Sequence, residues 1–280
     1  MDITASELVN RSSGIYALPE IHDKLNQQLD DPDSTNEQIS QIIQLDSGLS
    51  SSLLKIVNSA LYGFPSAIST ISQAISILGR RELTDLVFGK SAISVFKKLN
   101  IDPVDLQIHW NHSLYCGLIA KQTAKTLEDT KQSPDSLFIA GLLHDIGRLV
   151  LWQELPELSK KVLNLSHLSP LENASIEKAT LGFTHAEVGK ELLMKWKLPQ
   201  LLIDTTNFHH EPEKSKNYKQ ACQIINFSDI TSRVENIDSE GYSRLNDFTQ
   251  IKNMKITQND LLGITQIAQQ QLSEMTSMFL

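Results

Sequence analysis

The sequence predicts an all-α protein, a helical bundle with an N-terminal helical subdomain. Apolar residues recur at helical spacing along nearly the whole chain, and strict apolar–polar alternation never extends beyond about four residues. Helix-start and helix-stop signals recur between these periodic segments. The chain has 280 residues, of which 40% are hydrophobic and 21% charged. This composition excludes a disordered or fibrous protein and allows a sizeable core.

The first hundred residues predict three helices. Asp46 begins a helix whose inward-facing residues are expected to be Leu49, Leu53, Ile56, Val57 and Ala60. Thr70 and Gln73 fit a capping box, and Gly79 follows where a C-terminal glycine belongs. The next helix is expected over residues 80–99, with inward-facing Leu83, Leu86, Val87, Val95 and Phe96.

Capping signals also mark the later helices. A cap residue followed by proline, or a capping box, predicts where each one begins. The expected starts are Asp102-Pro103, Ser133-Pro134, Thr184, Pro199 and Thr257. The face that we expect the last helix to pack comprises Leu261, Leu262, Ile264 and Ile267. Residues 1–101 are thus predicted to form the N-terminal subdomain, residues 102–233 a second helical block, and residues 234–280 a polar loop and a final helix.

Charge and targeting signals limit where the protein works. The 25 lysines and arginines against 33 acidic residues give a net charge of −8, so no nucleic-acid partner is expected. The N-terminus lacks a signal-peptide pattern, and the longest apolar run, residues 137–143, is far short of the roughly 20 residues that span a membrane. Cys116 and Cys222 are expected to be reduced thiols. We therefore expect a cytoplasmic protein without a membrane partner.

Several enzyme motifs are excluded. Gly89-Lys90-Ser91 looks like the end of a P-loop, but Thr84 stands where the first glycine belongs and no strand precedes it. The chain has neither the G-x-S-x-G elbow nor the G-x-G-x-x-G fingerprint. It is therefore neither an α/β-hydrolase nor a dinucleotide enzyme.

Histidines and aspartates interrupt apolar helical segments at several places. Each alone is explained by a core hydrogen bond or an ion pair, and His112 is expected on a core-facing stripe with Val104, Ile108, Cys116 and Ile119. Together they supply donors from four or five helices, a set that suits one or two divalent ions of Fe, Mn, Ni or Zn. The candidate ligands are His112, His144, Asp145, His185, His209, His210 and Asp229.

The order of these residues resembles the HD superfamily of metal-dependent phosphohydrolases. The chain resembles more closely the HDOD proteins, the HD-related output domains of bacterial signalling. The resemblance runs from about residue 18 to residue 233, and it implies an HD-domain-like helical bundle with an N-terminal helical subdomain of about five helices. It rests on segments 42–49 (IIQLDSGL), 58–63 (NSALYG), 74–79 (AISILG) and 182–189 (GFTHAEVG), followed by Trp196, Leu198-Pro199 and His209-His210.

The resemblance implies two functions. As an HDOD protein, the chain would be a regulatory module with a signalling protein as partner, and its metal site could be structural. The same seven ligands match the HD-GYP phosphodiesterases, which implies as the alternative a phosphohydrolase or phosphodiesterase acting on a nucleotide-type ligand. Asp145 would then bridge the metal ions, and Arg148 would neutralise phosphate charge.

Three departures from the HD-GYP pattern bear on that alternative. No Gly-Tyr-Pro follows Glu211, Arg148 replaces a lysine, and Ile108 stands where some of these enzymes have a carboxylate. The departures weaken the case for cyclic-dinucleotide hydrolysis and leave the metal ligands intact. Whether the chain is an enzyme stays open at this level.

Overall fold

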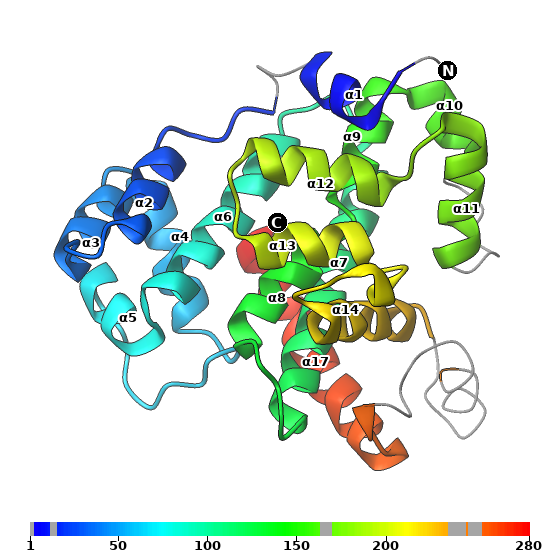
Figure 1. Ribbon diagram of the computed structural model, residues 1–280. Coiled ribbons are helices and arrows are strands. Elements are labelled where there is room, and N and C mark those ends of the chain that lie inside the picture. The colour runs from blue at the N-terminus through cyan, green and yellow to red at the C-terminus, as the bar shows by residue number, and fades with distance from the viewer. Residues whose placement is uncertain (1–2, 12–15, 163–169, 235–244, 246–253) are drawn as a thin grey trace. The chain divides into compact units, whose positions relative to one another are not determined.

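The computed structural model describes residues 3–11, 16–162, 170–234, 245 and 254–280. Within these ranges the secondary structure is helical and no strand occurs, which confirms the all-α prediction (Figure 1). The chain divides into two compact units. The larger unit comprises residues 1–15 and 99–269, and the smaller unit comprises residues 16–98 and 270–280. The domain limits expected from the sequence (1–101, 102–233 and 234–280) are not tested by this division and stay a prediction.

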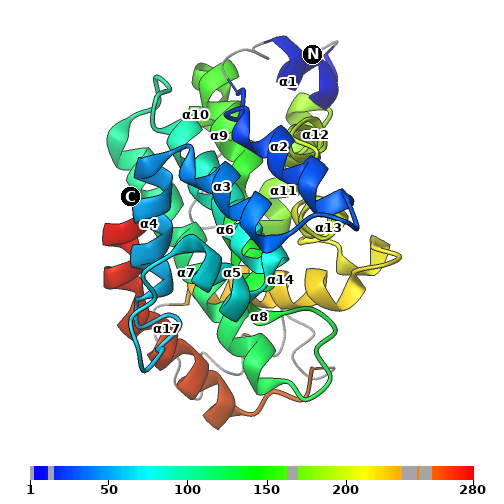
Figure 2. The same ribbon diagram turned by 90° about the vertical axis from the view of Figure 1, so that its left-hand side faces the viewer.

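The smaller unit contains a largely buried helix, α6 (Arg80–Phe96), which is labelled in Figure 2 together with α2, α3, α4 and α5. Helix α6 packs against α2, α4 and α5, and all five inward-facing residues predicted for it are buried. The prediction for α4 holds except at Ala60, which is exposed because the helix ends three residues earlier. The helices of this unit are α2 (Ile21–Asp30), α3 (Asn36–Gln44), α4 (Ser47–Val57), α5 (Ile71–Leu78), α6 (Arg80–Phe96) and the end of α17 (Gln258–Phe279).

Asn58, the first residue of the segment 58–63 (NSALYG), makes hydrogen bonds that join two parts of the smaller unit. Its side-chain amide donates to the carbonyl oxygens of Leu54 and Ile68, both at 2.8 Å. Its amide oxygen accepts the backbone N–H of Ile68 at 2.7 Å. Asn58 therefore ends α4 and ties it to the segment before α5, which is a structural role.

The larger unit contains the remaining helices and the candidate ligands. The side chains of Asp102, Ser133 and Thr184 each accept a backbone N–H at the expected helix starts, and Thr184 forms the full capping box with Glu187. The helices are α1 (Ala5–Arg11), α7 (Pro103–Thr126), α8 (Pro134–Leu143), α9 (Ile146–Glu154), α10 (Pro156–Val162), α11 (Pro170–Leu181), α12 (His185–Lys195), α13 (Gln200–Phe208), η1 (Pro212–Lys214), α14 (Lys219–Ser232) and the start of α17.

Two expectations about buried helix faces are wrong in part. Val104 and Ile108 are 66% and 62% exposed, because the first turns of α7 lie outside the core and the first buried residues of the helix are His109 and Trp110. In α17 Leu262 and Ile267 are also exposed, whereas Leu261 and Ile264 are buried and form one helical stripe with Ala268. The expected loop over residues 234–249 lies almost wholly outside the described residues.

Two glycine contacts bring the ligand-bearing helices close together. A Cβ atom at Gly141 of α8 would lie 2.6 Å from the Cα atom of Gly117 in α7. A Cβ atom at Gly147 of α9 would collide with the carbonyl oxygen of His185 and would lie 2.6 Å from the backbone nitrogen of Gly189 in α12. Only residues without side chains allow these approaches, which place the end of α8 and the start of α9 against both α7 and α12.

Candidate metal centre

The structure brings all seven predicted ligands together in the larger unit. His144 and Asp145 occupy the break between α8 and α9, and not the interior of one helix as the apolar run around them suggests. His185 begins α12, whereas His209 and His210 directly follow α13. His112 and Asp229 lie within α7 and α14. Five of the seven are buried, and the side chain of His112 is 17% exposed.

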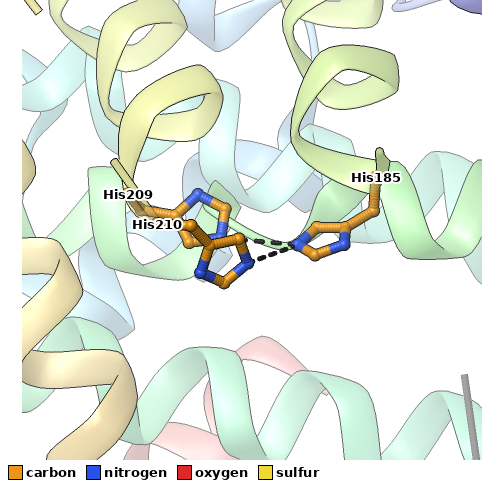
Figure 3. A group of neighbouring side chains, drawn as sticks. All are labelled: His185, His209 and His210. Carbon is orange, nitrogen blue, oxygen red and sulfur yellow. Dashed lines mark hydrogen bonds between the residues drawn. The ribbon is translucent and has the colours of Figure 1, made fainter. Parts of the chain in front are cut away.

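Three imidazoles form what we call the histidine half of the centre: His185, His209 and His210 (Figure 3). The Nε2 atom of His185 lies 3.0 Å from that of His210 and 3.4 Å from that of His209. The Oδ1 atom of Asp145 lies 3.0 Å from the Nε2 atom of His185 and 3.6 Å from that of His209. The three ring nitrogens thus lie within 4.8 Å of one another, and the Oδ1 atom of Asp145 approaches two of them.

A second group, the aspartate half, consists of His112, His144 and Asp229. The Oδ1 atom of Asp229 lies 3.1 Å from the Nε2 atom of His112 and 3.6 Å from that of His144. The Oδ2 atom of Asp145 lies 3.9 and 3.6 Å from the same two nitrogens. Asp145 therefore turns one oxygen toward each half, and its role as a bridging carboxylate stays a prediction.

Hydrogen bonds on the outer side of the rings fix how the imidazoles point. The Nδ1 atoms of His144 and His209 lie 2.7 Å from the carbonyl oxygens of Gly141 and Thr206. A carbonyl oxygen can only accept, so Nδ1 carries the proton in both rings. In the neutral ring each Nε2 atom therefore directs a lone pair into the centre, which is the arrangement that metal-binding histidines require.

The same arrangement holds for two further rings. The Nδ1 atom of His185 lies 2.6 Å from the Oε2 atom of Glu177. The Nδ1 atom of His112 lies 3.1 Å from the Oγ atom of Ser232, whose own proton goes to the carbonyl oxygen of Asp229. Four of the five imidazoles are thus held at Nδ1 and present Nε2 to the centre.

Charge within the centre matches a metal-binding role. Burial alone would raise the pKa of Asp145, but Arg148, His144 and His185 hold it well below its ordinary value, so the carboxylate is ionised. Burial lowers the pKa of His209, and that of His210 further. These two rings are neutral near pH 7 and can act as ligands without first losing a proton.

The donor set of the histidine half fits a divalent transition metal. Ligands about 2.0–2.1 Å from one ion lie roughly 3.0–3.4 Å from each other, which is the separation found among these nitrogens. Two facing lone pairs repel each other unless a proton or a cation lies between them. An ion bound by His185, His209, His210 and Asp145 would satisfy all four atoms.

Comparison with known proteins identifies the family. The HDOD domain model matches residues 15–212, well over half of the chain. The chain belongs to the HDOD family. The match includes six of the seven candidate ligands and ends before Asp229, so the last ligand comes from the part of the chain beyond the matched domain.

Solved structures share the fold of this HDOD protein. A provisionally named phosphohydrolase from Shewanella amazonensis SB2B superposes with a TM-score of 0.74 at 20% identity, covering 98% of both chains. An HDOD domain protein with unknown function from Geobacter sulfurreducens gives a TM-score of 0.67 at 22% identity, covering 98% of this chain and 96% of that one. A provisionally named signal transduction protein from Marinobacter aquaeolei VT8 gives 0.66 at 18% identity, over 94% and 59%.

A curated relative is considerably longer than this HDOD chain. An uncharacterized protein from Treponema pallidum (strain Nichols) is 29% identical over 230 residues, which are 82% of this chain and 44% of the relative. The chain thus spans less than half the length of that relative. None of the described helices is long and apolar enough to cross a membrane.

Two residues that matter to the HDOD centre were missed in the sequence. Glu177 of α11 is fully buried and accepts both the backbone N–H and the Nδ1–H of His185, at 2.7 and 2.6 Å. Arg233, one turn after Asp229, reaches back to that carboxylate at 2.7 Å. Arg233 could have been found from its i,i+4 spacing, and Glu177 from its place between the buried Ala174 and Leu181.

Arg148, the predicted catalytic arginine, is buried beside Asp145. Arg148 is only 8% exposed, and its Nε atom lies 2.9 Å from the Oδ2 atom of Asp145. A cleft of about 590 Å³ reaches the centre from another side, between α11, α12 and α13, with His210 in its wall. Its charges are balanced, since Lys178 pairs with Glu187 at 2.7 Å and Lys214 pairs with Glu211 at 2.6 Å.

Proposed function

We propose that this HDOD protein is a bacterial signalling module whose larger unit holds a divalent transition metal, and that it relays a signal through contact with a protein partner. The observation that carries the proposal is the convergence of three Nε2 atoms and one oxygen of Asp145 in the histidine half. The ion would be Fe, Mn, Ni or Zn, the metals that accept imidazole together with carboxylate.

The residues of the chain would divide the work at this centre. His185, His209, His210 and Asp145 would bind the ion, and Glu177 would orient the ring of His185 and raise its basicity. Against the effect of burial, Glu177 raises the pKa of His185, so this ring exchanges a proton for the metal. A bound ion lowers the pKa of a coordinated water and polarises a phosphoryl oxygen, if either one reaches it.

The alternative, a metal-dependent phosphohydrolase or phosphodiesterase, has one specific observation in its favour. Asp145 turns separate oxygens toward two groups of donors, as a carboxylate that bridges two ions would. The cleft beside His210 would admit a nucleotide-type ligand to the histidine half. In this function Asp145 would bridge the ions and Arg148 would stabilise charge on the phosphate.

The distribution of positive charge favours regulation over hydrolysis. A phosphate ester needs cations that are free to receive it. Among the described residues, both lysines of the cleft are paired with glutamates, and Arg148 and Arg233 are paired with Asp145 and Asp229. This charge balance supports a centre that binds metal without a ready site for a second anion.

Metal analysis of the full chain tests the proposal. After incubation with Mn²⁺ or Zn²⁺ and removal of the excess, we expect the wild type to retain metal and His209→Ala to lose it. His22→Leu, which changes a buried histidine of the smaller unit, is the matched control and should retain metal. A wild type without metal, or a His209→Ala protein with the same content, would refute the metal centre.

A turnover assay then separates regulation from hydrolysis. The metal-loaded wild type and a His144→Ala, Asp145→Ala double variant are compared on bis(p-nitrophenyl) phosphate and on cyclic dinucleotides. We expect no turnover above background from either protein. Hydrolysis by the wild type that the double variant loses while it stays folded would establish the phosphohydrolase instead.

A further inference from the structure

Arg233 places a positive charge inside the aspartate half. It caps the C-terminus of α14, and its Nε and Nη2 atoms lie 2.9 and 2.7 Å from the Oδ1 atom of Asp229. The same Nη2 atom lies 3.0 Å from the Nε2 atom of His112 and 3.6 Å from the Oδ2 atom of Asp145. One guanidinium nitrogen therefore lies among the three atoms that would bind an ion in this half.

A guanidinium and a metal ion cannot both use these atoms. Ser232 holds the Nδ1 atom of His112, so the lone pair on Nε2 is the only acceptor of that ring, and Arg233 donates to it. Arginine stays protonated in proteins, so the charge of Arg233 is permanent and repels a divalent ion at this distance. In the histidine half, by contrast, no contact between a described arginine and a ring nitrogen is seen, and the Nε atom of Arg148 lies 2.9 Å from Oδ2 of Asp145, the oxygen that faces the other half.

We infer that Arg233 is an internal cation that closes the aspartate half to metal, so that the chain holds one ion, in the histidine half, and binds a second only when Arg233 withdraws. The inference rests on the proposed metal centre. It assigns the metal stoichiometry of that centre to one side chain that is not itself a ligand.

Two observations support the replacement of the Arg233 guanidinium by an ion. The side chain of Arg233 is 38% exposed, whereas that of its partner Asp229 is fully buried, so the arginine can swing outward without disturbing the core. The guanidinium also satisfies only part of the donor set. The Nε2 atom of His144 and the Oδ2 atom of Asp229 are buried and have no hydrogen-bond partner. A second ion would use both of them.

The test is the number of Mn²⁺ ions bound by the full chain, measured by equilibrium dialysis and elemental analysis. Arg233→Met keeps most of the length of the side chain and removes its charge. We expect one ion per wild-type chain and two per Arg233→Met chain. Arg81→Met, at an exposed arginine of the smaller unit, should leave the count at one. Adding Asp229→Ala to Arg233→Met should return the count to one.

Electron paramagnetic resonance detects the binding of a second Mn²⁺ ion independently. Two Mn²⁺ ions bridged by Asp145 would couple magnetically, so the electron paramagnetic resonance spectrum of Arg233→Met should differ from the single-ion spectrum of the wild type. Two ions in the wild type, or one ion in both proteins, would overturn the role of Arg233 and leave the metal centre standing. No metal in either protein would refute the proposed metal centre, and the inference with it.

Discussion

The two halves of the centre have similar donors and different charge. Each offers three side chains and shares Asp145, yet only imidazoles face one another in the histidine half, whereas a guanidinium fills part of the aspartate half. The comparison teaches that the number of potential ligands does not fix the number of ions. The local positive charge decides which half still requires a cation.

Removing Asp145 should have the largest effect, because this residue turns an oxygen toward each half of the centre. Asp145→Ala leaves Arg148 buried without its carboxylate, and we expect the free energy of unfolding of the metal-free chain to fall by about 3–5 kcal/mol. Metal binding should be lost as well. Urea unfolding and metal analysis of the full chain measure the two effects.

A double variant separates these effects. Asp145→Ala with Arg148→Met removes both buried charges, so most of the stability should return while metal binding does not. Recovery of metal binding in the double variant would show that Asp145 is not a ligand.

A buried histidine of the smaller unit, His22, shows how an imidazole behaves without the hydrogen bonds that hold the rings of the centre. His22 is 3% exposed, stacks on Phe88 at 5.0 Å, and has no hydrogen-bond partner at either ring nitrogen. Burial lowers its pKa from 6.5 to about 4. Between these two pH values the unfolded chain takes up a proton that the folded chain does not, so stability is lost as the pH falls through this window.

The size of this loss can be measured by difference. Between pH 7 and pH 4 the wild type should lose roughly 3 kcal/mol more than His22→Leu, which has no such proton uptake. Urea unfolding at both pH values gives the comparison, and the other titrating groups cancel because both proteins contain them. Equal losses in the two proteins would mean that His22 is protonated in the folded state.

The close approach of α9 and α12 should control the histidine half selectively. A Cβ atom in Gly147→Ala would collide with the carbonyl oxygen of His185, so the helices must separate and the free energy of unfolding should fall by about 1–3 kcal/mol. Metal affinity should fall too, because His185 moves away from His209. Gly263→Ala, where a Cβ atom meets nothing within 4 Å, should leave both quantities unchanged or improved.

Changing Glu177 should have the smallest effect on metal binding, since Glu177 contacts only one candidate ligand of one half. Glu177→Gln keeps an oxygen that accepts the Nδ1–H of His185 and removes the negative charge, so metal affinity should weaken by about 10- to 100-fold. Competition with a chelator measures the change, and Glu128→Gln, at an exposed position, is the matched control. An unchanged affinity would show that Glu177 acts on the fold alone.

Local signals in the sequence were sufficient for the helices that begin at a recognisable cap and for the identities of the grouped residues, whereas α1, α2 and α3 were not predicted. Caps such as Asp102 and Thr184 and the apolar spacing within α6 depend on near neighbours in the chain, and the structure agrees with them. The grouping of His112 with His144 follows from the family resemblance, because their separation in the sequence gives no distance. Their roles as ligands stay a prediction.

The features that the sequence analysis did not predict depend on tertiary packing. Nothing in the sequence alone shows that the first turns of α7 leave the core, so Val104 and Ile108 were placed on a buried stripe. Glu177 and Arg233 gain their meaning only once α11 and α14 are packed beside the ligands. The break between α8 and α9 at His144 was hidden in an apolar run that continues on both sides.

The most direct test of the account is a crystal structure of the Mn²⁺-loaded full chain with anomalous diffraction data. The account predicts one anomalous peak, about 2.0–2.3 Å from the Nε2 atoms of His185, His209 and His210 and from the Oδ1 atom of Asp145. It also predicts the guanidinium of Arg233 beside Asp229. A peak in the aspartate half alone, or no peak in either half, would contradict it.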